Sequence, residues 1–334
     1  FYKGAHQATL DPLAARRPEG GLFMWSEQQE GAGYVTSGNP QFNNSSAAAL
    51  LSYDVAHSIP WDWRVSLYTW TKGIASGVYL IACLLVLLGV LRVDSPLWLW
   101  ATPILSGGFL AITGGLLIWD LEHPERFHLI FTRPQWRSWL VKGAFIIAGY
   151  TLVLLLHFIA SWLGSKSWQS WLMIPGVPLS LLTAIYTAYL FAQAKARDMW
   201  QNPLLPPHLV VQAALLGAAV LLPIASVMGN DIIMLSWILT ITSFIHLLMV
   251  WGEVSLTHPT AHARLAIWEM VQGRYKSDFW MGTILSFVGA LLPLLAVLGV
   301  VNISIGVGAT PFALIGLMLF ENAYVQAAQS VPLA

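Results

Sequence analysis

Residues 209–250 read LVVQAALLGAAVLLPIASVMGNDIIMLSWILTITSFIHLLMV, and this stretch decides the fold class. It contains two apolar runs of about 20 residues, the length that an α-helix needs to cross a bilayer. The tripeptide GND at 229–231 is all that separates them, so the two helices must be antiparallel neighbours. We therefore predict an all-α polytopic membrane protein.

The composition of the whole chain supports this prediction. Of its 334 residues, 57% are hydrophobic and 10% are charged, whereas soluble domains carry about 25% charged residues. The 17 tryptophans suit aromatic belts at two membrane interfaces. The net charge is zero, which gives no reason to expect a nucleic-acid partner. With Cys83 as its single cysteine, the chain is expected to bind no iron–sulfur cluster or other metal of its own.

Eight segments are long and apolar enough to span a membrane. They cover roughly 66–91, 97–118, 139–163, 171–194, 208–228, 232–252, 279–300 and 305–327. We expect two four-helix bundles, 61–200 and 201–334, behind a polar extramembrane extension at 1–60. The division rests on an internal echo, because the second span ends WDLEHPERF (119–127) and the sixth ends WGEVSLTHPTAH (251–262). Duplication and coincidence both remain open as explanations.

The charged loops favour one side of the membrane. Loops after the second, fourth and sixth spans hold nine Lys and Arg residues, and the loops on the opposite side hold two. The positive-inside rule then places both termini in the cytoplasm. Basic loops can equally bind an acidic partner subunit, and Arg126, Arg133 and Arg137 are candidate contacts.

Ionisable side chains inside spans are costly and mark candidate functional sites. His246 and Glu253 are seven residues apart on one helix face, and with Glu321 and His157 they are candidates for a proton path. Each also has a structural explanation: Glu253 can pair with a basic residue such as Arg264 or Arg274, and His157 can bond a neighbouring helix. Lys72 can equally be interfacial or snorkelling.

A haem b needs two axial histidines on facing helices. His157 and His246 are the two histidines well inside predicted spans, whereas His123 and His208 fall at span ends or in loops. Two such haems are excluded by this count, and we expect none.

Polar residues at the entry to the first span suggest a different ligand. Arg64, Tyr68 and Lys72 repeat every four residues and so share a helix face. A phenol or imidazole that donates to a carbonyl, beside a carboxylate that takes a proton, suits a quinone head group. We predict a quinone site at one membrane face, formed by Arg64, Tyr68, Asp120, His123 and Tyr186. All of these residues except Arg64 are predicted to exchange protons with the quinone. The competing explanation is an aromatic interface belt.

Four short motifs, in order, resemble the membrane subunits of the NrfD/polysulfide-reductase family, which are related to those of alternative complex III. LLIWDLEHPERF (116–127) resembles the signature at the end of the family's second helix, and YTWTKGIASGVYL (68–80) resembles its first helix. The fourth-helix Tyr-Thr-Gly motif is similar to IYTAYLF (185–191), with Ala188 in place of glycine. The loop before the seventh helix resembles HARLAIWEMVQGRYKSDFW (262–280).

The resemblance implies a subunit of a respiratory oxidoreductase in the bacterial cytoplasmic membrane. Such subunits bind menaquinone or ubiquinone in the first four helices and carry no cofactor of their own. They anchor an iron–sulfur subunit, often with a molybdopterin- or cytochrome-bearing subunit. It places Tyr68 on a quinone-contacting position, Tyr186 on the helix-four tyrosine, and Asp120 with Arg126 on the helix-two motif. A secondary transporter and a purely structural anchor are the alternative functions.

Overall fold

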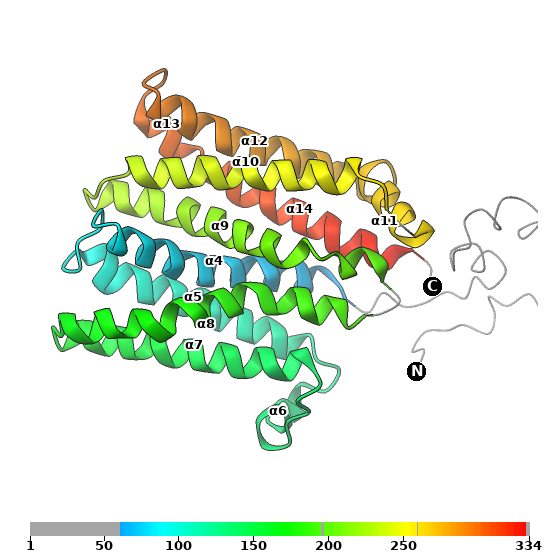
Figure 1. The fold of residues 1–334 in the computed structure, drawn as a ribbon, viewed down its shortest axis with the longest axis horizontal. Coiled ribbons are helices and arrows are strands. Elements are labelled where there is room, and N and C mark those ends of the chain that lie inside the picture. The colour runs from blue at the N-terminus through cyan, green and yellow to red at the C-terminus, as the bar shows by residue number, and fades with distance from the viewer. Residues whose placement is uncertain (1–60, 195–196, 259, 332–334) are drawn as a thin grey trace, which may run out of the picture.

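The computed structural model describes residues 61–194, 197–258 and 260–331, which form eight helical spans aligned along one direction (Figure 1). In chain order the spans are α4 (Trp63–Leu87), η2 with α5 (Leu97–Ala101, Thr102–Trp119), α7 (Trp139–Trp162), α8 (Lys166–Ala192), α9 (Leu205–Val227), α10 (Ile233–Ser255), α12 (Lys276–Val297), and α13 with α14 (Ile303–Gly308, Thr310–Ser330). The predicted count of eight is confirmed. The predicted extension at 1–60 lies outside the described residues.

Short helices occur in the loops at one end of the molecule. They are η3 (Pro124–Arg126), α6 (Leu129–Thr132), η4 (Asp198–Gln201) and α11 (Ala261–Val271). The opposite end has tight turns, as in the GND link, where Gly229 has a φ of 68° that favours glycine. Long loops therefore gather on one side, as predicted.

Local sequence sets the first helix start. Asp62 caps α4 by accepting a hydrogen bond from the backbone N–H of Arg64 at 2.8 Å, so the helix begins earlier than the predicted residue 66. At the same end of the molecule, Gln329 of α14 accepts a hydrogen bond from the Trp61 backbone N–H at 3.1 Å. The first span thus begins on the side where the last span ends, as an even number of spans requires.

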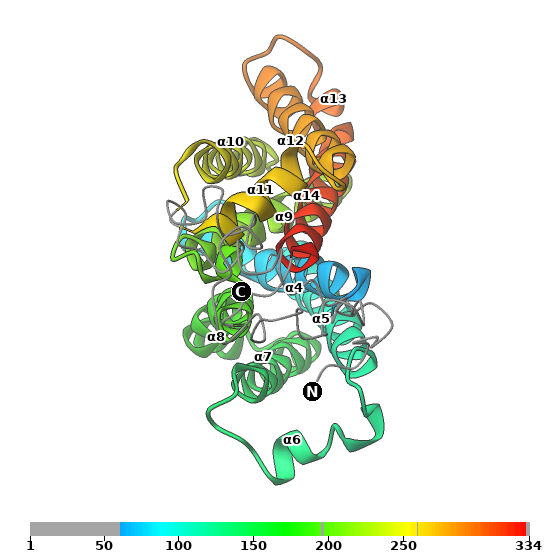
Figure 2. The same ribbon diagram turned by 90° about the vertical axis from the view of Figure 1, so that its right-hand side faces the viewer.

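Helix α4 is the centre of the fold, and it is the most buried of the eight spans. It packs against α5, α8, α9 and α14, and the end-on view in Figure 2 shows it between the two halves. In the first half α7 packs on α5 and α8, and in the second half α9, α10, α12 and α14 pack each on the next. Because α4 and α9 are in extensive contact across the boundary, the division into two bundles at 61–200 and 201–334 stays a prediction.

Candidate functional site

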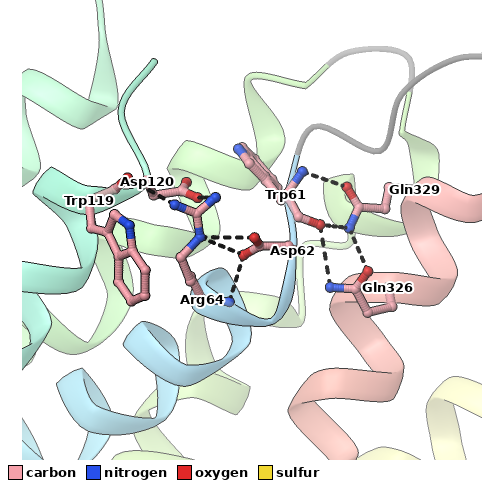
Figure 3. A network of polar contacts seen from close by, with 7 residues as sticks. All are labelled: Trp61, Asp62, Arg64, Trp119, Asp120, Gln326 and Gln329. Carbon is pink, nitrogen blue, oxygen red and sulfur yellow. Dashed lines mark hydrogen bonds and ion pairs between the residues drawn. The ribbon is translucent and has the colours of Figure 1, made fainter. Parts of the chain in front are cut away.

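The end of α5 is tied to the start of α4 by charged groups. Arg64 lies between two carboxylates: its Nε is 2.9 Å from Asp62, and its Nη2 is 3.6 Å from Asp120 (Figure 3). Arg64 also donates to the Trp119 carbonyl at 2.9 Å, an oxygen freed by the end of the helix. Asp120, whose side chain is 16% exposed, therefore faces the Arg64 guanidinium at the membrane boundary.

Burial raises the pKa of Asp120 above its usual value of 3.8; the Arg64 guanidinium opposes this shift and Asp62 adds to it. Because the folded protein holds this proton more tightly than the unfolded chain, the stability that it contributes is full below pH 3.8 and is lost as the pH rises through the raised value. Asp120→Asn is therefore expected to gain stability relative to wild type as the pH rises. Thermal unfolding of wild type and Asp120→Asn in detergent, followed from pH 3.8 upward, measures the effect.

Asp94→Asn is the matched control, because Asp94 has the opposite shift. A hydrogen bond from Arg92 lowers the pKa of Asp94 to about 2, so its contribution is present above the ordinary pKa and is lost as the pH falls. Asp94→Asn should lose stability relative to wild type as the pH rises between these values. Parallel profiles for wild type and Asp120→Asn would contradict the account of Asp120.

The remaining helix-two candidates point away from the protein interior. His123 is 59% exposed and lies 3.2 Å from the Glu125 carboxylate. Arg126, Arg133 and Arg137 are exposed as well. These side chains lie on the loop that carries η3 and α6, where they can contact a partner or water.

An apolar cavity of about 220 Å³ opens between α5, α7 and α8, beneath the loop with η3 and α6. A cavity of about 150 Å³ lined by similar side chains is enough to bind benzene, so this one accommodates a substituted six-membered ring. Its walls are formed by Gly114, Leu117, Ile118, Leu121, Phe127, Ile130, Phe131, Leu140, Ala144, Ile147, Ala148 and Tyr186. Asp120 and His123 are absent from this lining, whereas Tyr186 belongs to it.

Tyr186 lines the cavity, and a second buried phenol, Tyr68, lies close to it. Tyr186 and Tyr68 are 1% and 2% exposed, and they lie close enough to interact electrostatically. Neither hydroxyl makes a hydrogen bond of good geometry within the described part of the chain. A buried hydroxyl without a partner costs about 1–3 kcal/mol, so a ligand oxygen is a natural acceptor for either group. Gly143 of α7 leaves the space that the Tyr186 ring occupies.

Lys72 lies directly behind Tyr186, and its placement corrects the interfacial interpretation. It is 1% exposed, and its Nζ donates to the Ala184 carbonyl at 2.9 Å and to Thr187 Oγ1 at 2.5 Å. The Nζ is also 5.0 Å from the Tyr186 ring centroid. Lys72 cannot snorkel to water because α4 is enclosed by other helices. The small residues that follow it in the sequence were the available signal for this enclosure.

The histidines have different partners in the two halves. His157 is buried against Trp98 and Tyr79, with ring centroids 4.5 and 5.8 Å away. His246 forms a 2.8 Å hydrogen bond with His208 between α10 and α9. His208 lies at a span end, as predicted, but it is buried there, because α9 begins at Leu205 with prolines in its first turn.

Glu253 and Glu321 lie in separate surroundings. The Glu253 carboxylate accepts a hydrogen bond from the Asn202 amide, so neither Arg264 nor Arg274 is its partner as the structural alternative had it. Glu321 is 5% exposed and lines a small cavity beside His208, where its charge interacts with that of Lys72. Among the described residues no three His, Cys, Asp or Glu side chains gather into a metal site.

Comparison with known proteins adds the family. The family described as "Polysulphide reductase, NrfD" matches residues 52–331. The chain belongs to the NrfD family. "Protein NrfD" of Escherichia coli (strain K12) is 24% identical over 278 residues, covering 71% of this chain and 84% of that protein. A selenate reductase subunit of Mesobacillus selenatarsenatis is 23% identical over 300 residues, covering 75% of this chain and 68% of that protein.

Membership confirms the resemblance seen in the four motifs and gives the chain a coarse function. NrfD-family proteins are multi-pass membrane subunits of oxidoreductase complexes in the bacterial inner membrane, and the eight spans agree with that role.

Proposed function

We propose that this chain binds a quinone, menaquinone or ubiquinone, in the cavity beneath α6 and exchanges electrons with a peripheral iron–sulfur subunit. The observation that carries the proposal is the apolar cavity whose wall includes Tyr186, with Tyr68 close to it and neither hydroxyl in a hydrogen bond of good geometry within the described residues. The aromatic ring and isoprenoid chain of a quinone suit apolar walls, and its carbonyl oxygens accept hydrogen bonds from phenols.

Electrons must come from another polypeptide, because one cysteine cannot hold an iron–sulfur cluster. The cavity opens beside the loop that carries Arg126, Arg133 and Arg137, whose exposed charges suit an acidic partner surface. We place the iron–sulfur subunit against this loop, with a molybdopterin- or cytochrome-bearing subunit beyond it. The excess of Lys and Arg in the loops on this side of the membrane also favours a cytoplasmic location for both termini.

Asp120 and His123 have supporting roles in this proposal. Asp120 holds Arg64 and so fixes the end of α5 to the start of α4 beside the cavity. His123 is exposed on the loop and can exchange protons with water. Proton translocation, with His157, His246, Glu253 and Glu321 as path candidates, is the finer part of the proposal.

Tyr186→Phe tests the site in the complex in which the chain occurs. Removing the hydroxyl is expected to weaken quinone binding by about 2- to 10-fold, the worth of one hydrogen bond. The quinone-free protein should lose little or no thermal stability, because that hydroxyl makes no hydrogen bond of good geometry among the described residues. Quinone titration and thermal unfolding of the depleted complex measure the two effects.

Tyr150→Phe is the matched control. The Tyr150 hydroxyl is equally buried, but it donates to the Ala75 carbonyl at 2.8 Å and Tyr150 does not line the cavity. This variant should lose stability and keep quinone affinity, the opposite pattern. Equal quinone affinity in wild type and in Tyr186→Phe would refute the site, and an absence of quinone binding would favour a structural anchor. Substrate uptake into liposomes would favour a transporter.

A further inference from the structure

A lysine and a glutamate on two neighbouring helices lie within electrostatic range of each other in the protein interior. Lys72 belongs to α4 and Glu321 to α14, and both are almost fully buried. Each charge interacts with the other, yet no direct ion pair joins them in the described part of the chain. Buried charges of this kind are costly unless they are paired or functional, so their joint presence calls for an explanation.

The Glu321 side opens into a cavity large enough for about one water molecule. Its volume is about 10 Å³, close to the minimum that a buried water needs. Its walls are formed by Thr69, Phe191, Leu205, His208, Leu209, Gln212, Phe320, Glu321 and Tyr324. The Gln212 side-chain oxygen makes no hydrogen bond within the described residues, so a water here would also satisfy a buried acceptor.

The Lys72 side leads to the two phenols through a hydroxyl group. Lys72 Nζ donates to Thr187 Oγ1 at 2.5 Å, and the Thr187 hydroxyl lies beside both Tyr68 and Tyr186. Tyr186 in turn lines the apolar cavity. Hydrogen-bonding groups thus lead from Lys72 to the quinone cavity, and Glu321 lies within electrostatic range of Lys72.

We propose that Lys72 and Glu321 form a proton-storing pair that supplies the quinone site through Thr187 and Tyr186. This rests on the proposed quinone function. The pair has zero net charge with the proton on either member, as ammonium and carboxylate or as amine and carboxylic acid. One proton can therefore move between them without leaving an uncompensated charge in the membrane interior.

A bound quinone would take its proton from the Tyr186 phenol as it receives an electron from the iron–sulfur partner. The Thr187 hydroxyl would reprotonate the phenolate as it accepts a proton from the Lys72 ammonium, which leaves the Lys72 amine near the Glu321 carboxylate. A proton taken up by Glu321 would then pass to the amine and restore the neutral pair. Each round moves one proton from the pair to the quinone for one electron, two rounds give the quinol, and quinol oxidation reverses them.

A polar cavity at the membrane boundary, here called the vestibule, can return a proton to the Lys72–Glu321 pair. This cavity of about 400 Å³, with Met199, Asn202, Glu253 and His258 among its lining residues, lies between η4, α10 and α11. The Tyr324 phenol donates to the Met199 carbonyl at 3.2 Å and interacts electrostatically with both Glu253 and Glu321. Tyr324 therefore connects the vestibule with the buried pair.

The double variant Lys72→Met with Glu321→Met tests the pair. Removing one member alone leaves an unbalanced buried charge and endangers folding, whereas the double variant removes both. We expect it to assemble and bind quinone with wild-type affinity, and to lose about 100-fold in quinone-linked turnover, the lower end of what a positioned proton donor contributes. A purely structural pair would give wild-type turnover in the double variant, which would overturn the proposal.

Thr187 offers a milder second test. Thr187→Val keeps the shape and removes the hydroxyl, and Thr187→Ser restores it. Turnover should fall in Thr187→Val, with a larger solvent deuterium isotope effect, and recover in Thr187→Ser, while quinone affinity stays constant in all three. Wild-type turnover in Thr187→Val would overturn the relay and leave quinone binding intact. A wild-type complex that binds no quinone would instead overturn the proposed function, and the relay with it.

Discussion

Gly77→Val is expected to destabilise the folded protein strongly and to lower its yield. A Cβ atom at Gly77 would overlap the Ala213 carbonyl oxygen and lie 2.9 Å from the Gly217 nitrogen of α9. These are backbone atoms that no rotamer change can move, so α4 and α9 would have to separate. Overpacking usually costs about 1–3 kcal/mol, and we expect this variant to reach or exceed the upper figure.

The measurement is the yield of monodisperse protein extracted from membranes, together with its midpoint of thermal unfolding. Gly107→Ala is the control, because a Cβ at that helical glycine meets no atom within 4 Å. It should keep the wild-type yield and can gain stability from the better helix propensity of alanine. A wild-type unfolding midpoint for Gly77→Val would show that α4 and α9 are not in backbone contact at this glycine.

The sequence allowed the spans to be predicted because a bilayer imposes one strong rule. Each span must satisfy its own backbone and present about 20 apolar residues. Span boundaries were less accurate where capping decides them: Asp62 starts α4 earlier than hydropathy indicates. The two prolines at 206–207 suggest that the fifth span begins after them, at residue 208. In the structure they belong to the first turn of α9, which begins at Leu205, and His208 is buried.

The site was predictable in part, for reasons that also come from packing. The aromatic helix-four motif led to Tyr186, which does line the cavity, and helix periodicity placed Tyr68 near it. Periodicity cannot show that α4 lies at the centre of the fold, so the burial of Lys72 does not follow from it. The electrostatic interaction between Lys72 and Glu321 joins helices some 250 residues apart in the sequence, and a single sequence does not show that such distant segments are neighbours.

The possible duplication gains support from one pair of contacts. Asp120, at the end of the second span, binds Arg64 at the start of the first. Glu253, at the end of the sixth span, binds Asn202 just before the fifth. In both cases an acidic residue at the end of one span bonds a residue at the start of the preceding span. Both contacts lie on the same side of the molecule. One half places an apolar cavity near this contact, and the other half places the polar vestibule there.

Gly143→Ala is expected to abolish most quinone-linked turnover while leaving the fold in place. A Cβ at Gly143 would lie 2.5 Å from both Cδ2 and Cε2 of the Tyr186 ring. The ring cannot retreat easily, because Lys72 lies behind it with Nζ 5.0 Å from its centroid. It must therefore shift relative to the cavity, which misaligns the phenol that we propose to face the quinone. Positioning errors of about 1 Å can cost on the order of 100-fold in rate.

Gly149→Ala, on the same helix, separates this effect from helix propensity. There a Cβ would meet Leu179 at 3.5 Å, an ordinary van der Waals distance, so turnover and quinone affinity should match wild type. Tyr186→Ala supplies the second control, because it removes the ring that the new methyl group displaces. In that background Gly143→Ala should cause no further loss of quinone affinity, since the two positions act through one contact. An undiminished loss would mean that Gly143 serves the spacing of α7 and α8, and that the Tyr186 ring does not set the position of the quinone.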